Sequence, residues 1–358
     1  MAHRSLPALF HCWTNSLWLR IFLLYRYGLG EMVSSSGYIV VTGGAGFIGS
    51  GLIRHLNEQG TDQIVVVDRL GTTEKWRNLV GKRFALLMDK SELFDWLDSS
   101  PGAIAAFFHL GACSSTVETD ASYLLDNNYR YSQRLAKYAA HYGIPFLYAS
   151  SAATYGDGAL GFCDDEAELQ SLRPLNMYGF SKQLFDLWLQ REGLLRHFIG
   201  CKFFNVFGPN EQHKGRMASA ALHFLRQLQQ EGRLRLFAST VADQFGDGEQ
   251  CRDFIYVKDA VRITAALLEK GVGGIYNVGS GIASSWNRLA NALFSAMGQT
   301  PQIDYVAMPE DLRGKYQNYT CADMEKTHRS LGAIAHSRSL EEAIADYLHH
   351  HLLLDQLW

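Results

Sequence analysis

YIVVTGGAGFIGS, at residues 38–50, predicts how the first half of this chain is arranged. Its opening residues form a short apolar run with β-branched side chains, which is typical of a buried parallel strand. Gly43, Gly46 and Gly49 follow at three-residue spacing, and an amphipathic run over 47–56 predicts a helix. Strand, glycine turn and helix in this order predict a dinucleotide site. The glycines let the backbone approach a pyrophosphate, and the helix N-terminus offers free N–H groups.

A carboxylate after the second strand supports this interpretation. The next apolar run, residues 63–67, ends at Asp68, 19 positions after Gly49. An acidic residue that binds the adenosine ribose stands at about this distance in such folds. Asp68 favours NAD because it repels a 2′-phosphate, whereas Arg69 and Lys75 favour NADP because they can bind that phosphate. These residues alone leave the choice between NAD and NADP open.

Apolar runs and amphipathic segments continue to alternate through the first half. The runs predict strands at 84–88, 105–110, 146–149 and 199–204, and the amphipathic segments predict helices at 121–141 and 178–191. This alternation predicts an α/β fold: a doubly wound parallel (Rossmann) sheet with a smaller α/β substrate-binding domain.

The domain limits follow from where this pattern begins and stops. We expect a nucleotide-binding domain at 37–204, with 251–285 returning to it, and a substrate-binding domain built from 205–250 and 286–358. The second of these segments should contain an amphipathic helix near 340–353. Residues 1–36 do not share the pattern, and we expect a poorly ordered N-terminal extension there, with a peripheral amphipathic anchor as the alternative.

The composition favours a cytoplasmic enzyme. Hydrophobic residues make up 47% of the chain and charged ones 19%, which suits a well-buried core. The net charge of −3 argues against nucleic acid as a partner, and we expect no membrane partner. The six cysteines include no CxxC pair and no histidine cluster accompanies them, so we expect reduced thiols and no metal site.

The catalytic chemistry is expected at Tyr178 and Lys182, in the order YGFSK. Four residues apart on a helix, these side chains share one face. A neighbouring ammonium favours the phenolate and should lower the tyrosine pKa, which makes the phenol a better base. Lys182 can also hold the nicotinamide ribose, and Ser151, at the end of a predicted strand, can hydrogen-bond the reacting oxygen.

Several further segments resemble the extended short-chain dehydrogenase/reductase superfamily and, within it, the family of ADP-L-glycero-D-manno-heptose 6-epimerases. The resemblance covers about residues 38–350. Its segments are HLGACSST (109–116), DNNY (126–129), FLYASSAATYG (146–156), PLNMYGFSK (174–182), FFNVFGP (203–209), HKGRMAS (213–219) and CRDFIYVKD (251–259).

The resemblance implies an activity and its setting. The family inverts carbon six of the heptose in ADP-D-glycero-β-D-manno-heptose, by transient oxidation and re-reduction with bound NADP, as a step towards the lipopolysaccharide core. We therefore expect NADP, with NAD tolerated, and ADP-heptose as substrate. The resemblance also implies a homo-oligomer, with a homopentamer favoured.

The resemblance further implies roles for individual residues. It assigns catalysis to Ser151, Tyr178, Lys182 and Lys214, with Tyr178 and Lys214 as the two acid/base groups. It assigns cofactor contacts to Gly43, Gly46, Phe47, Ile48, Gly49, Asp68, Arg69, Lys75, Lys90, Leu110, Gly111, Ala112, Cys113, Ser114, Asn127, Lys182 and Val206. It assigns substrate contacts to Asn205, Lys214, Arg216, His223, Phe237, Ala238, Ser239, Thr240, Arg252 and Tyr316. Arg216 stands where the family pattern has a small serine, and an arginine there can bind phosphate.

Three other functions are weighed against this one. A sugar 4,6-dehydratase needs an acidic pair after the strand-end hydroxyl residue, and this chain has Ala152 and Ala153 there. A UDP-sugar 4-epimerase shares Ser151, Tyr178 and Lys182 but needs no counterpart of Lys214, and it remains the main alternative. A non-catalytic nucleotide-sensing protein on the same fold is the third, because a fold does not determine function.

Overall fold

The structure is a computed structural model that describes residues 37–99, 103–310 and 316–358 of the 358-residue chain. The expected N-terminal extension, with its alternative as an anchor, lies outside the described residues. The part of the chain that the structure describes contains no helix that is both long enough and apolar enough to span a membrane.

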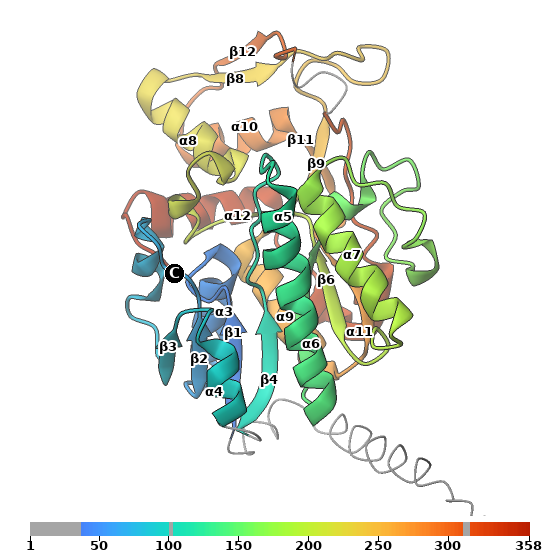
Figure 1. Ribbon diagram of the computed structural model, residues 1–358. Coiled ribbons are helices and arrows are strands. Elements are labelled where there is room, and N and C mark those ends of the chain that lie inside the picture. Colours follow the sequence, from blue (N-terminus) through green and yellow to red (C-terminus); the bar gives the residue numbers. More distant parts are fainter. Residues whose placement is uncertain (1–36, 100–102, 311–315) are drawn as a thin grey trace, which may run out of the picture.

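The described core is a seven-stranded sheet in the order β10-β6-β5-β4-β1-β2-β3, in which every pair is parallel. From β1 the order continues with β2 and β3 on one side, and with β4, β5, β6 and β10 on the other. The chain therefore builds the sheet outward in both directions from its centre, which confirms the doubly wound parallel sheet (Figure 1). Its strands are β1 (Tyr38–Thr42), β2 (Ile64–Val67), β3 (Leu86–Met88), β4 (Ile104–His109), β5 (Phe146–Ser151), β6 (Ile199–Phe203) and β10 (Gly274–Val278).

Helices cover both faces of this sheet. α3 packs against α9 on one face, and α6 and α7 lie in front of the other face in Figure 1. The helices and helical turns of this part are α3 (Phe47–Glu58), η1 (Glu74–Leu79), α4 (Leu93–Ser99), α5 (Ala121–Leu124), η2 (Leu125–Arg130), α6 (Tyr131–Tyr142), η3 (Ala152–Tyr155), η4 (Glu166–Glu168), α7 (Met177–Arg191), α9 (Val257–Lys270), α11 (Glu325–Leu331) and η6 (Gly332–Ala335).

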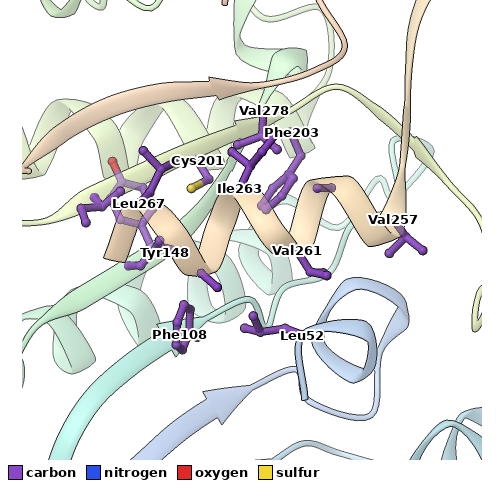
Figure 2. Close-up of a cluster of buried hydrophobic side chains, with 14 of the residues drawn as sticks. Leu52, Phe108, Tyr148, Cys201, Phe203, Val257, Val261, Ile263, Leu267 and Val278 are labelled. Atoms are coloured by element: carbon purple, nitrogen blue, oxygen red, sulfur yellow. The ribbon is translucent and has the colours of Figure 1, made fainter. Parts of the chain in front are cut away.

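Side chains of α9 pack against the central sheet in a hydrophobic core. This packing explains why the strand sequences are continuous apolar runs. Every residue of β2 is buried, because helices cover both faces. Figure 2 shows Val261 and Leu267 of α9 packed among side chains from α3 and four strands, including Leu52, Phe108 and Tyr148. Burial of such side chains is the main stabilising contribution to the fold.

Two predicted helices contain π-helical turns that apolar spacing did not indicate. The helix predicted at 121–141 is divided into α5, the π-helical turn η2 and α6. The helix predicted near 340–353 is α12 (Leu340–Tyr347) followed by the π-helical turn η7 (Leu348–Leu352). A π turn admits one extra residue, which rotates the following side chains, and such turns are frequent at functional sites.

The later segments build a second group of elements above the sheet in Figure 1. A three-stranded sheet has the order β11-β9-β7, and β12 pairs with β8 in parallel. Within the segment 251–285, β10 returns to the central sheet beside β6, whereas β9 pairs with β7 and β11. The limits expected for the nucleotide-binding and substrate-binding domains stay a prediction. The elements are β7 (Asn205–Phe207), η5 (Gln212–Met217), α8 (Ala220–Glu231), β8 (Leu234–Phe237), β9 (Cys251–Tyr256), β11 (Ala283–Ser285), α10 (Trp286–Ala296) and β12 (Ile303–Val306), together with α12.

Candidate active site

A cavity of about 710 Å³ lies at the carboxyl ends of the central strands, where α/β proteins bind their ligands. Its volume is in the range of small-molecule sites, roughly 300–1,000 Å³. All four predicted catalytic residues line it: Ser151, Tyr178, Lys182 and Lys214. Every predicted cofactor residue lines it as well, except Cys113.

The glycine turn has the geometry of a phosphate cradle. Gly43 has φ +70°, and a Cβ there would lie 2.7 Å from the Cα of Gly111. A Cβ on Gly49 would lie 2.2 Å from the carbonyl oxygen of Gly43. No side chain caps α3, so its first N–H groups remain for an anion. These features fit the pyrophosphate of a dinucleotide.

Asp68 lies at the end of β2, as expected, but its carboxylate already has three donors. It accepts hydrogen bonds from the backbone N–H of Ala45 (2.9 Å) and of Arg69 (2.8 Å). Lys75 Nζ lies 2.7 Å from Asp68 Oδ1, so an ammonium offsets the charge that would repel a 2′-phosphate. Arg69 is an exposed residue that also lines the cavity.

The π-helical turn η2 carries two successive asparagines, of which Asn127 lines the cavity. Asn127 Oδ1 accepts a hydrogen bond from Lys90 Nζ (2.5 Å). Asn128 accepts from the N–H of Cys113 (2.8 Å) and donates to its carbonyl (2.9 Å). Cys113 itself does not line the cavity. Its backbone is held by Asn128, a residue that the sequence did not indicate.

Tyr178 and Ser151 both line the cavity, and the Ser151 side chain is near enough to influence the pKa of the phenol. The expected lowering of the tyrosine pKa is wrong: burial raises the pKa of Tyr178, and the Ser151 side chain only opposes that shift. Lys182 Nζ donates to the carbonyl of Ala149 (2.7 Å), and burial lowers the pKa of Lys182 to about 8, opposed by the charge of Asp186. A phenol with a raised pKa is held in its protonated form, ready to donate.

Lys214 enters the same cavity from the turn η5. Its Nζ lies 5.5 Å from the centre of the Phe47 ring at the start of α3. Asn78 joins the two segments, because its Nδ2 donates to the carbonyls of Ala45 and Asn210, both at 3.0 Å. Burial lowers the pKa of Lys214, and the nearby carboxylate of Glu211 opposes that shift.

Glu211 holds the loop that carries Lys214. This fully buried carboxylate accepts hydrogen bonds from the N–H of Gly208 (3.1 Å) and the hydroxyls of Ser219 (2.7 Å) and Tyr347 (3.1 Å). Neither Glu211 nor Asn78 carries a local sequence signal, since their partners are scattered along the chain.

The predicted substrate residues divide into two groups. Asn205 and Lys214 line the cavity. The remaining ones lie outside its lining, and their role stays a prediction: Arg216, His223, Phe237, Ala238, Ser239, Thr240, Arg252 and Tyr316.

An aromatic cluster connects part of the second group to the cavity. The guanidinium of Arg252 lies 4.9 Å from the Tyr316 ring and 5.5 Å from the Trp286 ring. Trp286 Nε1 donates to the Tyr316 hydroxyl (2.7 Å), and Phe237 packs edge-on against Tyr316. Trp286, which the sequence did not indicate, lines the cavity, so this cluster extends its wall.

Arg216 and His223 are exposed beside one another, with His223 Nε2 3.4 Å from the carbonyl of Arg216.

Among the described residues, no group of three or more histidine, cysteine or acidic side chains could hold a metal ion. The five cysteines in the described residues are free thiols: Cys113, Cys163, Cys201, Cys251 and Cys321.

Comparison with known proteins gives a consistent result. A model of the NAD dependent epimerase/dehydratase family matches residues 39–279. An ADP-L-glycero-D-manno-heptose-6-epimerase of Nitratidesulfovibrio vulgaris is 50% identical over 316 residues, which cover 87% of this chain and 97% of that protein. The enzyme of the same name from Fusobacterium nucleatum is 44% identical over 326 residues, 88% of this chain and 98% of that protein.

Solved structures share the fold across more than one activity. The Helicobacter pylori ADP-L-glycero-D-manno-heptose-6-epimerase superposes with a TM-score of 0.72 at 27% identity, over 88% of this chain and 96% of its own. A UDP-glucose 4-epimerase of Thermotoga maritima gives 0.73 at 26% identity, over 89% and 100%. The fold therefore does not distinguish these activities.

Proposed function

Since the chain belongs to the NAD dependent epimerase/dehydratase family, we propose that it is an epimerase that converts ADP-D-glycero-β-D-manno-heptose to its L-glycero epimer by inversion at carbon six. Identity of 44–50% to proteins with this name, over 87–88% of the chain, supports this substrate. The structural observation that carries the proposal is that Tyr178 and Lys214 line one cavity together with the glycine turn.

The chemistry follows from what inversion at a secondary alcohol requires. The C–H bond of such a carbon is not acidic, so the alcohol must be oxidised to a ketone and then reduced on the opposite face. A bound nicotinamide dinucleotide supplies this reversible redox chemistry. The glycine turn, the α3 N-terminus and the Asp68–Lys75 pair would hold that cofactor in this chain.

The residues of the chain handle the protons. The hydroxyl of one epimer gives up its proton as the ketone forms, and the hydroxyl of the other takes one up. Since the two hydroxyls point in different directions, one acid/base group on each side is useful. Tyr178, aided by Ser151, serves one orientation, and Lys214 serves the other. Lys182 orients the cofactor ribose beside Tyr178.

The preferred cofactor is NADP, with NAD tolerated. Lys75 supports this, because its ammonium is paired with Asp68 at the place where a 2′-phosphate would lie. Lys75→Met should weaken NADP binding about tenfold or more, since a hydrogen bond to a charged group contributes roughly 1.5–3 kcal/mol. NAD binding should change little, because the freed Asp68 can then bind the 2′-hydroxyl.

Dissociation constants for both cofactors test this, with Lys137→Met as the control. Lys137 is an exposed lysine on α6 outside the cavity. Equal losses for NADP and NAD, or no loss for either, would contradict a role of Lys75 in choosing between them.

The alternatives differ from the proposal in their substrate. A UDP-sugar 4-epimerase would turn over UDP-galactose, and a nucleotide-sensing protein would turn over neither sugar nucleotide. Incubation with ADP-heptose and, separately, with UDP-galactose distinguishes all three functions. We expect turnover of ADP-heptose alone.

The setting of the enzyme also belongs to the proposal. We expect a cytoplasmic homo-oligomer, with a homopentamer favoured, that supplies heptose for the lipopolysaccharide core and binds neither nucleic acid nor membrane. The free thiols of the described residues agree with a reducing compartment.

A further inference from the structure

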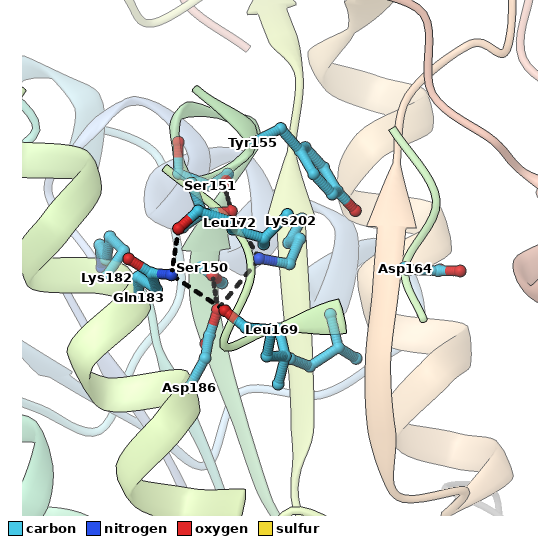
Figure 3. A network of polar contacts seen from close by, with 12 residues as sticks. Ser150, Ser151, Tyr155, Asp164, Leu169, Leu172, Lys182, Gln183, Asp186 and Lys202 are labelled. Carbon is cyan, nitrogen blue, oxygen red and sulfur yellow. Dashed lines mark hydrogen bonds and ion pairs between the residues drawn. The ribbon is translucent and has the colours of Figure 1, made fainter. Parts of the chain in front are cut away.

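A fully buried ion pair lies directly behind the catalytic residues. Asp186 of α7 and Lys202 of β6 both have 0% exposed surface, and Lys202 Nζ lies 3.1 Å from Asp186 Oδ2. The carboxylate also accepts hydrogen bonds from the hydroxyls of Tyr148 (2.8 Å) and Ser150 (2.7 Å). Figure 3 shows Asp186 of α7 with Ser150 at the end of β5 and Lys202 at the end of β6.

The pair is connected to Ser151 from two sides. Ser150 precedes Ser151 in β5 and donates to Asp186. Thr154 accepts a hydrogen bond from Lys202 Nζ (2.5 Å) and donates its own to the carbonyl of Ser151 (2.8 Å). The backbone that carries the Ser151 hydroxyl is therefore fixed by Asp186 before it and by Lys202 after it.

The carboxylate is also close to Lys182. Tyr178, Lys182 and Asp186 recur at four-residue spacing and so share one face of α7. The charge of Asp186 opposes the effect of burial on the Lys182 pKa, and the thiol of Cys113 acts in the same direction. His109, which also faces Lys182, stays neutral, because burial and the lysine charge lower its pKa to about 3.

Packing alone does not account for these charges. A buried ion pair can often be replaced by apolar residues at no cost in stability, because desolvation offsets the attraction between the charges. A purely structural contact between α7 and the sheet would need neither an aspartate one helical turn after Lys182 nor a lysine that donates a hydrogen bond to Thr154.

We propose that Asp186 and Lys202 are positioning residues of the reaction: together they fix the backbone of Ser151, and the Asp186 carboxylate keeps Lys182 in its ammonium form. This inference rests on the proposed function, since Ser151 and Lys182 have their roles in it. The two parts make different predictions, because only Asp186 supplies the negative charge.

Asp186→Asn tests both parts. We expect kcat for ADP-heptose to fall about 10²-fold, the size of effect that a small misplacement of catalytic groups produces, with KM nearly unchanged. In the unmodified enzyme, the rate should decline as the pH rises through about 8, where Lys182 loses its proton. In Asp186→Asn this alkaline decline should move to lower pH, because the ammonium form has lost its favourable charge.

Lys202→Met separates the two parts. It should lower kcat through Thr154 and Ser151, but the alkaline decline should not move to lower pH, because the Asp186 carboxyl group is still present on the Lys182 face of α7. The double variant Asp186→Asn/Lys202→Met leaves no unpaired buried charge and should stay folded even where a single variant does not. Its alkaline decline should still begin at lower pH than that of the unmodified enzyme.

Asp259→Asn is the matched control, since Asp259 is another buried carboxylate, paired with Arg262 and Arg338 outside the cavity. It should lower the melting temperature without changing the pH profile. A second readout that needs no substrate is the titration of the Lys182 ammonium by NMR on protein labelled with ¹⁵N-lysine, assigned with Lys182→Arg.

The outcomes separate the inference from the proposed function. If the unmodified enzyme does not turn over ADP-heptose, the proposed function fails, and the NMR titration still decides whether Asp186 sets the charge of Lys182. If the unmodified enzyme is active, but the double variant keeps its kcat, its pH profile and its Lys182 titration, the pair is only structural and the inference is overturned.

Discussion

Tyr178→Phe should lower the kcat for epimerisation by about 10²–10⁴-fold, the usual contribution of a general acid–base group. The phenylalanine ring keeps the packing of the tyrosine, and the substitution removes only the hydroxyl from the cavity that Tyr178 shares with Ser151. Because burial raises the Tyr178 pKa, the phenol is the resting form, and its proton is the one lost in the variant. Cofactor binding and the melting temperature should stay close to those of the unmodified enzyme.

Tyr138→Phe is the control for this loss. Tyr138 lies outside the cavity, and its hydroxyl donates to the carbonyl of Leu97 (3.1 Å), so its removal should cost about 1 kcal/mol of stability and no activity. Steady-state kinetics of both variants give the comparison. A near-normal kcat in Tyr178→Phe would remove Tyr178 from the mechanism.

Lys214→Met should abolish most epimerisation while it spares a reaction on one face. Methionine keeps much of the aliphatic volume and removes the ammonium that lies near Phe47. If Lys214 is the second acid/base group, we expect a loss of about 10²–10⁴-fold in epimerisation. Oxidation or reduction of a substrate analogue that needs only Tyr178 should be much less affected, and NADP binding should be unchanged.

The control is Lys326→Met, a partly buried lysine that pairs with Glu166 outside the cavity. It should change neither reaction. Small and equal effects of Lys214→Met on epimerisation and on the one-face reaction would leave Lys214 without a catalytic role and would favour the UDP-sugar 4-epimerase.

Each part of the predicted site that the structure brings to the cavity lies within one short segment of the chain. The glycine turn, the acid at the end of β2 and the helix with Tyr178 and Lys182 each depend on spacing within one short segment. The cavity brings these segments together, because the carboxyl ends of parallel strands lie at one edge of the sheet. The doubly wound parallel sheet could therefore be predicted without knowledge of any side-chain contact.

The residues that sequence reasoning missed act across long separations. Asn78 joins Ala45 to Asn210, and Asn128 holds Cys113. Trp286 reaches the cavity from α10. In the sequence each of them is a single polar or aromatic residue without a periodic partner. Asp186 differs, because its four-residue spacing from Lys182 is a signal that sequence reasoning could have used.

One wrong prediction and one missed feature have a common physical reason, which is that residue spacing does not report the environment of a side chain. The sequence placed Lys182 near Tyr178 and predicted a lowered tyrosine pKa, but burial has the larger effect and raises it. Similarly, the helix predicted over 121–141 is present, but its spacing did not indicate the π-helical turn within it. The π-helical turn η2, which carries Asn127 at the cavity and Asn128 behind it, does not interrupt the apolar periodicity enough to be detected.

The most direct test of the proposed function is the incubation with ADP-D-glycero-β-D-manno-heptose carried out in D₂O and followed by NMR. We expect inversion at carbon six with the original hydrogen retained on that carbon, because the hydrogen leaves and returns without exchange with water. We also expect no turnover of UDP-galactose in a parallel reaction. Absence of epimerisation, deuterium at carbon six of the product, or inversion of UDP-galactose at carbon four would contradict the proposed function.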